Sequence, residues 1–193
     1  MSRVIVAALA AVLLLAVPAH AQLVEAGSEG IEDYASYQPQ TKCSPKAKPG
    51  ALSLGHWLVN RQGGGFGGIS RPCTSGGTSE HKEGRAFDWR LDANKLADRQ
   101  GAAAFLALVR ETDQAGNSDA RARRMGIMYI IWNDKMYASW EDFEPKNYLS
   151  SSCRNRRTCS PTLRHRDHMH ISLSMAGAKG RTSWYVEAVA LTS

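Results

Sequence analysis

Apolar residues at helical spacing predict three helices. Residues 52–58 form a short amphipathic pattern that stops before the glycine-rich run 63–68. The alanine- and leucine-rich segment 102–112 repeats its large apolar residues every three to four positions, as a core-facing helix does. Segment 119–125 is predicted to be a third helix, with Ser118 as its N-cap. The glycine run itself is predicted to be a mobile turn that borders a cleft.

Patterns typical of strands follow these helices. Residues 127–132 (IMYIIW) are β-branched and aromatic, which predicts a buried strand, and residues 133–135 turn the chain into a second strand, 136–140. Residues 168–174 (HMHISLS) alternate polar and apolar, as a half-buried strand does, and a further short strand is expected at 88–91. The expected fold is α+β: a small antiparallel sheet with helices packed on one face and long, cysteine-tied loops around the cleft.

The N-terminus has the pattern of an export signal. Arg3 precedes the apolar stretch 4–17, and Ala19-His20-Ala21 is a small-residue cleavage signature, so residues 1–21 are predicted to be a secretory signal peptide. The apolar stretch is shorter than the about 20 residues of a transmembrane helix, so no membrane span is expected after cleavage. Residues 22–50 are predicted to be a poorly structured lead-in, and residues 51–193 a single domain that is expected to be monomeric.

The four cysteines and the charge refine this picture. An even number of cysteines in an exported protein predicts disulfides, and no Cys-x-x-Cys pair is present to favour a zinc finger. Of the three possible connectivities we favour Cys153 with Cys159 as a local clasp and Cys43 with Cys73 as a tie between the lead-in and the domain. The net charge of +6 favours anionic partners such as wall polymers, phospholipid headgroups or nucleic acid.

Two polar clusters suggest metal chemistry. Residues 79–89 and 165–170 together contain four of the six histidines and several carboxylates. Catalytic zinc sites use three protein ligands, commonly histidine nitrogens and a carboxylate oxygen, and keep a fourth position for water. On a strand, His168 and His170 would point to the same face. Either cluster alone is more simply explained by structural histidines, with Asp88 pairing to a neighbouring arginine, but the two together favour a metal site.

The ordered motifs resemble a known family. Ser79-x-His81-x-x-Gly84-x-Ala86-x-Asp88, followed downstream by His-x-His, is similar to the LAS group of zinc metallopeptidases, which includes D-alanyl-D-alanine carboxypeptidases of the VanY type. The spacing His165-x-x-His168-x-His170 is similar to that of the penicillin-insensitive murein endopeptidases of the same group. GTSEHKEGRAFDW, GIMYIIWN and TLRHRDHMHIS, in that order, resemble a VanY-like domain of secreted actinobacterial proteins, over residues 43–174.

This resemblance implies a set of site residues. His81, Asp88 and His170 would be the zinc ligands. His168 would position the substrate or stabilise the transition state, with His165 as a further active-site group. Asp167 stands where the carboxypeptidases carry a glutamate that acts as general base, one methylene longer, so either Asp167 or His168 would be the base here.

A cation must also meet the oxyanion of an acyl-transfer transition state. Arg71, just before Pro72 and Cys73, is the best candidate because a disulfide at Cys73 would hold its loop, although a surface arginine is an equally good interpretation. Trp132 and Trp140 could line a substrate groove, but core packing is the simpler expectation.

The resemblance implies a secreted zinc peptidase associated with the cell wall, which hydrolyses peptide bonds in peptidoglycan stem peptides or crosslinks. The basic loop 153–159 could bind an anionic wall polymer or be only a solvated face. One alternative is a non-catalytic zinc-containing module that binds the wall. A metal-dependent nuclease is a weaker alternative, because no second acidic cluster is present for a hard cation, so no nucleic-acid partner is expected.

Overall fold

The computed structural model describes residues 30–190, with side chains through Val186, so the predicted signal peptide lies outside the described residues. Its centre is a six-stranded antiparallel sheet in the order β1-β2-β6-β3-β4-β5, which confirms the predicted α+β fold. The strands are β1 Gly65–Gly68, β2 Ala86–Arg90, β3 Ile127–Trp132, β4 Lys135–Ala138, β5 Pro145–Asn147 and β6 His168–Leu173. The α-helices are α1 Pro49–Gln62, α2 Leu96–Val109, α3 Ala120–Arg124, α4 Met175–Ala178 and α5 Ser183–Ala190, and two short 3-10 helices are η1 Glu80–Glu83 and η2 Ser139–Glu141.

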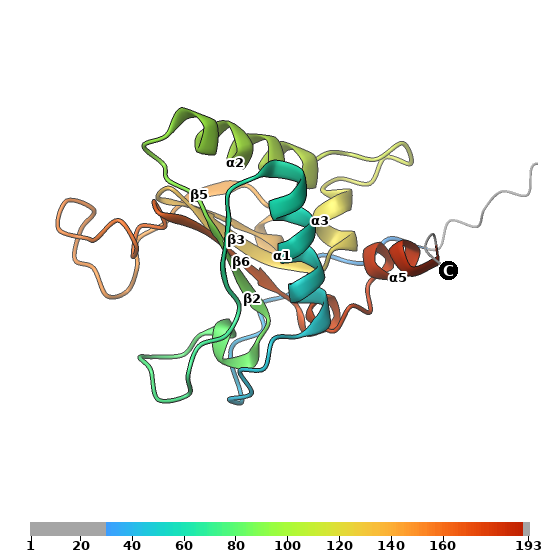
Figure 1. Cartoon of the computed structure of the whole chain (residues 1–193). Helices are drawn as coiled ribbons and strands as arrows, with labels where there is room; N and C mark the ends of the chain where they lie inside the picture. Colours follow the sequence, from blue (N-terminus) through green and yellow to red (C-terminus); the bar gives the residue numbers. More distant parts are fainter. Residues whose placement is uncertain (1–29, 191–193) are drawn as a thin grey trace, which may run out of the picture.

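Helices α1, α2 and α3 lie on one side of the sheet (Figure 1). The core between the helices and the sheet is apolar, and Phe87 and Met169 of the central strands pack there against Leu54 of α1 and Phe105 of α2. Because successive side chains of a strand alternate between faces, the intervening residues of β2 and β6 point to the opposite, loop-covered face. That second face carries the polar side chains of the sequence clusters.

The helices differ from the prediction at both ends. The first spans Pro49–Gln62, with proline in its first turn and Gly63 as its C-cap, both typical of such positions. The second begins at Leu96 and not at residue 102. Its first turn points to solvent, with Leu96 itself exposed, so the apolar spacing that reveals the rest of the helix is missing there.

The glycine run is a strand and not the predicted mobile turn. Residues Gly65–Gly68 form edge strand β1, which pairs antiparallel with β2. A side chain at Gly67 would come within 2.5 Å of the Asp88 carbonyl oxygen, so glycine allows this close approach. The opposite edge strand, β5, was also absent from the sequence prediction. Trp140 lies in η2, beyond the end of β4.

The described part of the lead-in, residues 30–48, has no helix or strand but is tied to the domain by specific contacts. Backbone amides of Thr41 and Lys42 donate to the Glu83 carboxylate at 3.0 and 3.2 Å. A disulfide joins Cys43 to Cys73, and a second joins Cys153 to Cys159, which confirms the favoured pairing. No helix within residues 30–190 is long and apolar enough to cross a membrane.

Candidate metal centre

Three predicted ligands meet on the loop-covered face of the sheet. Asp88 of β2 and His170 of β6 are register partners, and η1 brings His81 over them. The Asp88 Oδ1 atom lies 3.1 Å from His81 Nε2 and 3.1 Å from His170 Nδ1, and the two nitrogens are 3.2 Å apart. Ligand distances of ~2.0–2.1 Å in a tetrahedron give edges of roughly 3.3 Å. The three atoms therefore already form a triangle of the size that one zinc ion requires, and this group could hold a metal.

The residues at the two ends of the turn that carries His81 fix its conformation. The Ser79 hydroxyl accepts a hydrogen bond from the His81 backbone amide, and Gly84 closes the turn in the left-handed region at φ 63°. A side chain at Gly84 would come within 2.1 Å of the Lys46 carbonyl oxygen. Glycine is therefore required there both for its backbone conformation and for its lack of a side chain.

Hydrogen bonds on the outer side of each ring orient the two histidines. His81 Nδ1 lies 2.8 Å from the Ile69 carbonyl oxygen, which only accepts, so Nδ1 carries the proton and the Nε2 lone pair faces the centre. His170 Nε2 lies 2.9 Å from the Ser172 hydroxyl, which leaves Nδ1 directed at the centre. The ring of Tyr129 stacks on His170, with centroids 5.5 Å apart and planes 26° from parallel.

Burial and charge keep these groups in their metal-binding forms. His81 and His170 are only 3% and 7% exposed, whereas the Asp88 side chain is 25% exposed. Burial alone would raise the pKa of Asp88, but the neighbouring His170 and His81 outweigh burial and hold that pKa far below its usual range. Burial lowers the pKa of His170 despite the attraction of Asp88. A carboxylate and a neutral imidazole are the protonation states that bind metal.

His168 lies between the three-ligand group and Asp167. Its Nδ1 is 2.7 Å from Asp167 Oδ1, and its Nε2 is 3.7 Å from Asp88 Oδ1. Asp167 also accepts a hydrogen bond from the Thr162 hydroxyl. Burial would raise the pKa of Asp167, but the bonds from Thr162 and His168 lower it. The Asp167 carboxylate therefore orients His168 through its Nδ1 atom, on the side of the ring away from the three ligands.

His165 completes the histidine cluster. Its backbone is in the left-handed region, with φ 50°, and its ring centroid lies 4.8 Å from that of His168 and 5.7 Å from that of His170. Burial, with the neighbouring His170 and His168 as smaller causes, lowers the pKa of His165 to about 3, so the ring is neutral. Its Nδ1 is buried and has no hydrogen-bond partner among the described residues. Such an atom is available to a group that enters the site.

The comparison with known families identifies the chain. Residues 43–156 match the family model described as VldE, C-terminal domain, over more than half of the sequence. The chain belongs to the VldE C-terminal domain family. No curated protein and no solved structure matched it.

This assignment overturns the resemblance to the LAS group and its VanY-type carboxypeptidases. The motifs behind that resemblance consist largely of histidines and an aspartate, spaced as a three-ligand centre needs on neighbouring antiparallel strands. That pattern follows from the chemistry and does not separate one family from another. The match to the VldE C-terminal domain contains His81 and Asp88 and ends before His170.

The structure separates the remaining sequence candidates. The backbone amide of Arg71 donates to the His81 carbonyl at 3.2 Å, but the side chain is exposed and no described contact joins it to the three ligands. Arg85, considered as a partner for Asp88, instead bonds Glu83 at 2.7 Å. His56 lies exposed on α1, as expected of a structural histidine.

Sequence reasoning missed the residues that support the centre. Ser172 lies two positions after His170 and so shares its strand face, a spacing that could have revealed it. Tyr129 and Glu80, joined by a 2.7 Å hydrogen bond, come from different parts of the chain, and no local pattern relates them.

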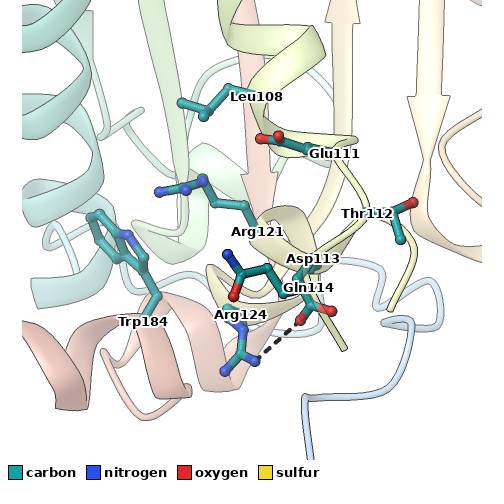
Figure 2. Close-up of a pocket in the computed structure, with 9 residues that line it drawn as sticks. Leu108, Glu111, Thr112, Asp113, Gln114, Arg121, Arg124 and Trp184 are labelled. Atoms are coloured by element: carbon teal, nitrogen blue, oxygen red, sulfur yellow. Dashed lines mark hydrogen bonds and ion pairs between the residues drawn. The ribbon is translucent and has the colours of Figure 1, made fainter. Parts of the chain in front are cut away.

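A separate hollow lies among the helices and takes no part in this centre. It is lined by residues of α2, α3, α5 and the loop after α2. Asp113 and Arg124 form an ion pair there at 3.4 Å, and Figure 2 marks it with a dashed line. None of its lining residues belongs to the three-ligand group.

Proposed function

We propose that this domain is an exported zinc-dependent hydrolase that cleaves peptide bonds. The observation that carries the proposal is the triangle of ligand atoms from His81, Asp88 and His170, with sides of 3.1–3.2 Å. Two imidazoles and one carboxylate favour zinc over magnesium or calcium, which prefer sites made of oxygen atoms alone. The two disulfides support a location outside the reducing cytoplasm.

The residues around the centre support a hydrolytic role. When bound, zinc would supply a Lewis acid for the substrate carbonyl and lower the pKa of water toward ~7. His168 is suited to take a proton, because Asp167 holds its Nδ1–H and leaves the Nε2 lone pair toward the centre. The same imidazolium would then give that proton to the leaving amine. We therefore propose His168 as the general base and Asp167 as the residue that positions it.

His165 is the better candidate for a contact with the substrate oxygen than Arg71. Its neutral imidazole touches the rings of His168 and His170, and its buried Nδ1 lacks a partner among the described residues. A neutral imidazole in the tautomer with a proton on this nitrogen would donate to an oxygen of the substrate.

The proposed substrate is a peptide in an extracellular polymer such as peptidoglycan. The charge of +6 supports attraction to an anionic wall polymer, and the basic loop 153–159 offers three arginines for such a contact. A wall-binding module without turnover remains the alternative that the activity assay below distinguishes.

Metal analysis tests the centre. We expect the purified protein to bind about one zinc per chain and His81→Ala to lose most of it. His56→Ala is the matched control, since it removes an exposed histidine on α1 and should retain full zinc. Full zinc occupancy in His81→Ala would show that the ligand assignment is wrong.

Activity is tested on short peptides and on purified sacculi by counting newly freed amino groups. His168→Gln should keep zinc and lower the rate by roughly 10²–10⁴-fold, the usual contribution of a general base. Asp167→Asn should have a smaller effect, because the ring keeps its place with a weaker partner. No release by zinc-loaded wild type would favour the binding module, and cleavage of a plasmid instead would favour a nuclease.

A further inference from the structure

A cavity of about 390 Å³ adjoins the metal centre, and this volume lies in the range of small-ligand sites. Its walls include four aromatic side chains and one acidic side chain. They are formed by Tyr37, Gln40, Thr78, Glu80, Tyr129, Ile131, Met136, Trp140, Tyr148 and Ser151.

Three wall residues join the cavity to the centre. Tyr129 stacks on the His170 ring, Tyr148 contacts the His165 ring at 5.2 Å, and Glu80 immediately precedes His81 in η1. A molecule held at the centre would therefore extend naturally into the cavity. The side chains of its walls would therefore contact the part of the substrate next to the bond that is hydrolysed.

The charge of the cavity is opposite to that of the whole protein. The chain has a net charge of +6, yet the cavity lining contains Glu80 and no lysine or arginine. Glu80 is 6% exposed, and its Oε2 accepts a hydrogen bond from the Tyr129 hydroxyl at 2.7 Å. Its Oε1 is 3.9 Å from Arg85, which instead bonds Glu83 at 2.7 Å. Arg85 thus forms an ion pair with Glu80 without a hydrogen bond among the described residues, and the Glu80 Oε1 atom keeps the capacity to accept one.

The aromatic walls meet at steep angles. The Tyr37 and Trp140 rings lie 5.3 Å apart at 63°, and the Trp140 and Tyr129 rings 6.0 Å apart at 72°. Tyr37 and Trp140 are also 55% and 40% exposed, so these two rings can be reached from solvent. Rings set at such angles present their faces in different directions, and a cation is attracted to a ring face within about 6 Å of its centroid.

We propose that this cavity binds an ammonium group of the substrate, held by the Glu80 carboxylate and the faces of Tyr37, Tyr129 and Trp140. That this ammonium group belongs to a substrate rests on the proposed hydrolase function, but its binding can be tested without turnover. A carboxylate and aromatic rings recognise an ammonium group by charge-assisted hydrogen bonding and cation–π attraction.

Isothermal titration calorimetry on the zinc-loaded protein tests the proposal. The probes are the Nα-acetyl methylamides of lysine, Nε-acetyl-lysine and norleucine, which keeps the four-carbon chain and lacks the ammonium group. We expect the lysine probe to bind about tenfold more tightly than either of the others. Glu80→Gln should abolish this preference. Glu141→Gln, which removes the same charge from an exposed residue beside Trp140 outside the lining, should retain it.

Trp140→Leu provides an independent variant, since Trp140 is part of the wall and 40% exposed. It should reduce the preference for lysine without loss of zinc. Equal binding of the three probes by wild type would overturn the proposal, as would tighter binding of N-acetylglucosamine oligomers than of the lysine probe. A lysine preference in a protein that hydrolyses no peptide would uphold the ammonium site and reject the proposed hydrolase.

Discussion

Two loops bring side chains to the candidate metal centre, and different contacts hold each loop in place. The ligand loop, residues 79–85, delivers His81, and the histidine loop, residues 160–167, delivers His165 and Asp167. The ligand loop is anchored by buried charges: Arg85 bonds Glu83 at 2.7 Å, and both side chains are at most 5% exposed.

The histidine loop is anchored at the surface. Arg164 donates two hydrogen bonds to Asp134 at 2.9 and 2.7 Å, and Arg166 donates one to Asn133 at 2.7 Å. The Arg164 and Asp134 side chains are 25% and 14% exposed. Buried ion pairs are costly to break, whereas exposed pairs are screened by salt and contribute little. The ligand loop should therefore be rigid under most conditions, and the position of the histidine loop should depend on salt and pH.

Breaking the buried anchor should have the largest effect. Arg85→Met leaves the Glu83 carboxylate buried without its cation, which should lower the free energy of unfolding by about 3–5 kcal/mol. Urea unfolding in the presence of a chelator measures this loss apart from metal binding. Arg90→Met is the matched control, because Arg90 is exposed at the end of β2 and should cost under about 0.5 kcal/mol. Equal unfolding midpoints for the two variants would contradict a structural role for the buried pair.

The two disulfides extend the comparison, since one tethers the loop next to His81 and the other lies just before the histidine loop. Cys43 and Cys73 are 30 positions apart, and Cys153 and Cys159 only 6. On chain entropy, replacing the first pair by serine should cost roughly 3–4 kcal/mol and the second roughly 2 kcal/mol. Thermal and urea unfolding of the two double variants measures both. The reverse order would show that contacts of the loops, and not loop closure, dominate.

Local patterns predicted the parts of this molecule that depend on neighbours in sequence. The alternation in residues 168–174 placed His168 and His170 on one face and Met169 in the core, because a strand has a period of two. Zinc chemistry pointed to a metal site in the two polar clusters, the resemblance to the LAS group named its three ligands, and the pairing of Cys153 with Cys159 followed from proximity in the chain. The same chemistry misled the family assignment, since ligand spacing is shared by unrelated zinc proteins.

Features that depend on distant partners were not predictable in the same way. Residues Gly65–Gly68 (GFGG) carry a single side chain, Phe66, which is too little for an alternating pattern, and pairing with β2 makes them a strand. Glu83 is buried because the Arg85 side chain and the distant backbone amide of Thr41 both donate hydrogen bonds to its carboxylate. Asp167 was a candidate base by position, but its side chain lies behind His168, which only the three-dimensional arrangement reveals.

The surface anchor of the histidine loop should give the smallest effect, and that effect should depend on pH. Hydrogen bonds from Arg164, against a smaller opposing effect of burial, hold the pKa of Asp134 below its usual range. In the unfolded chain that pKa returns to about 3.9. The carboxylate therefore stabilises the fold above about pH 4, and this contribution is lost as the pH falls through the lowered pKa of the folded state.

Asp134→Asn should thus be less stable than wild type at about pH 7, with a difference that shrinks at about pH 3 and in about 1 M salt. Urea midpoints under these three conditions measure it, and Asp33→Asn, at an exposed position of the lead-in, is the control for simple loss of a charge. If the ion pair positions the histidine loop, Asp134→Asn should also change the rate of hydrolysis while leaving zinc affinity intact, since His81, Asp88 and His170 belong to other elements. A difference from wild type that is the same at both pH values and at high salt would mean that the charge of Asp134 does not anchor this loop.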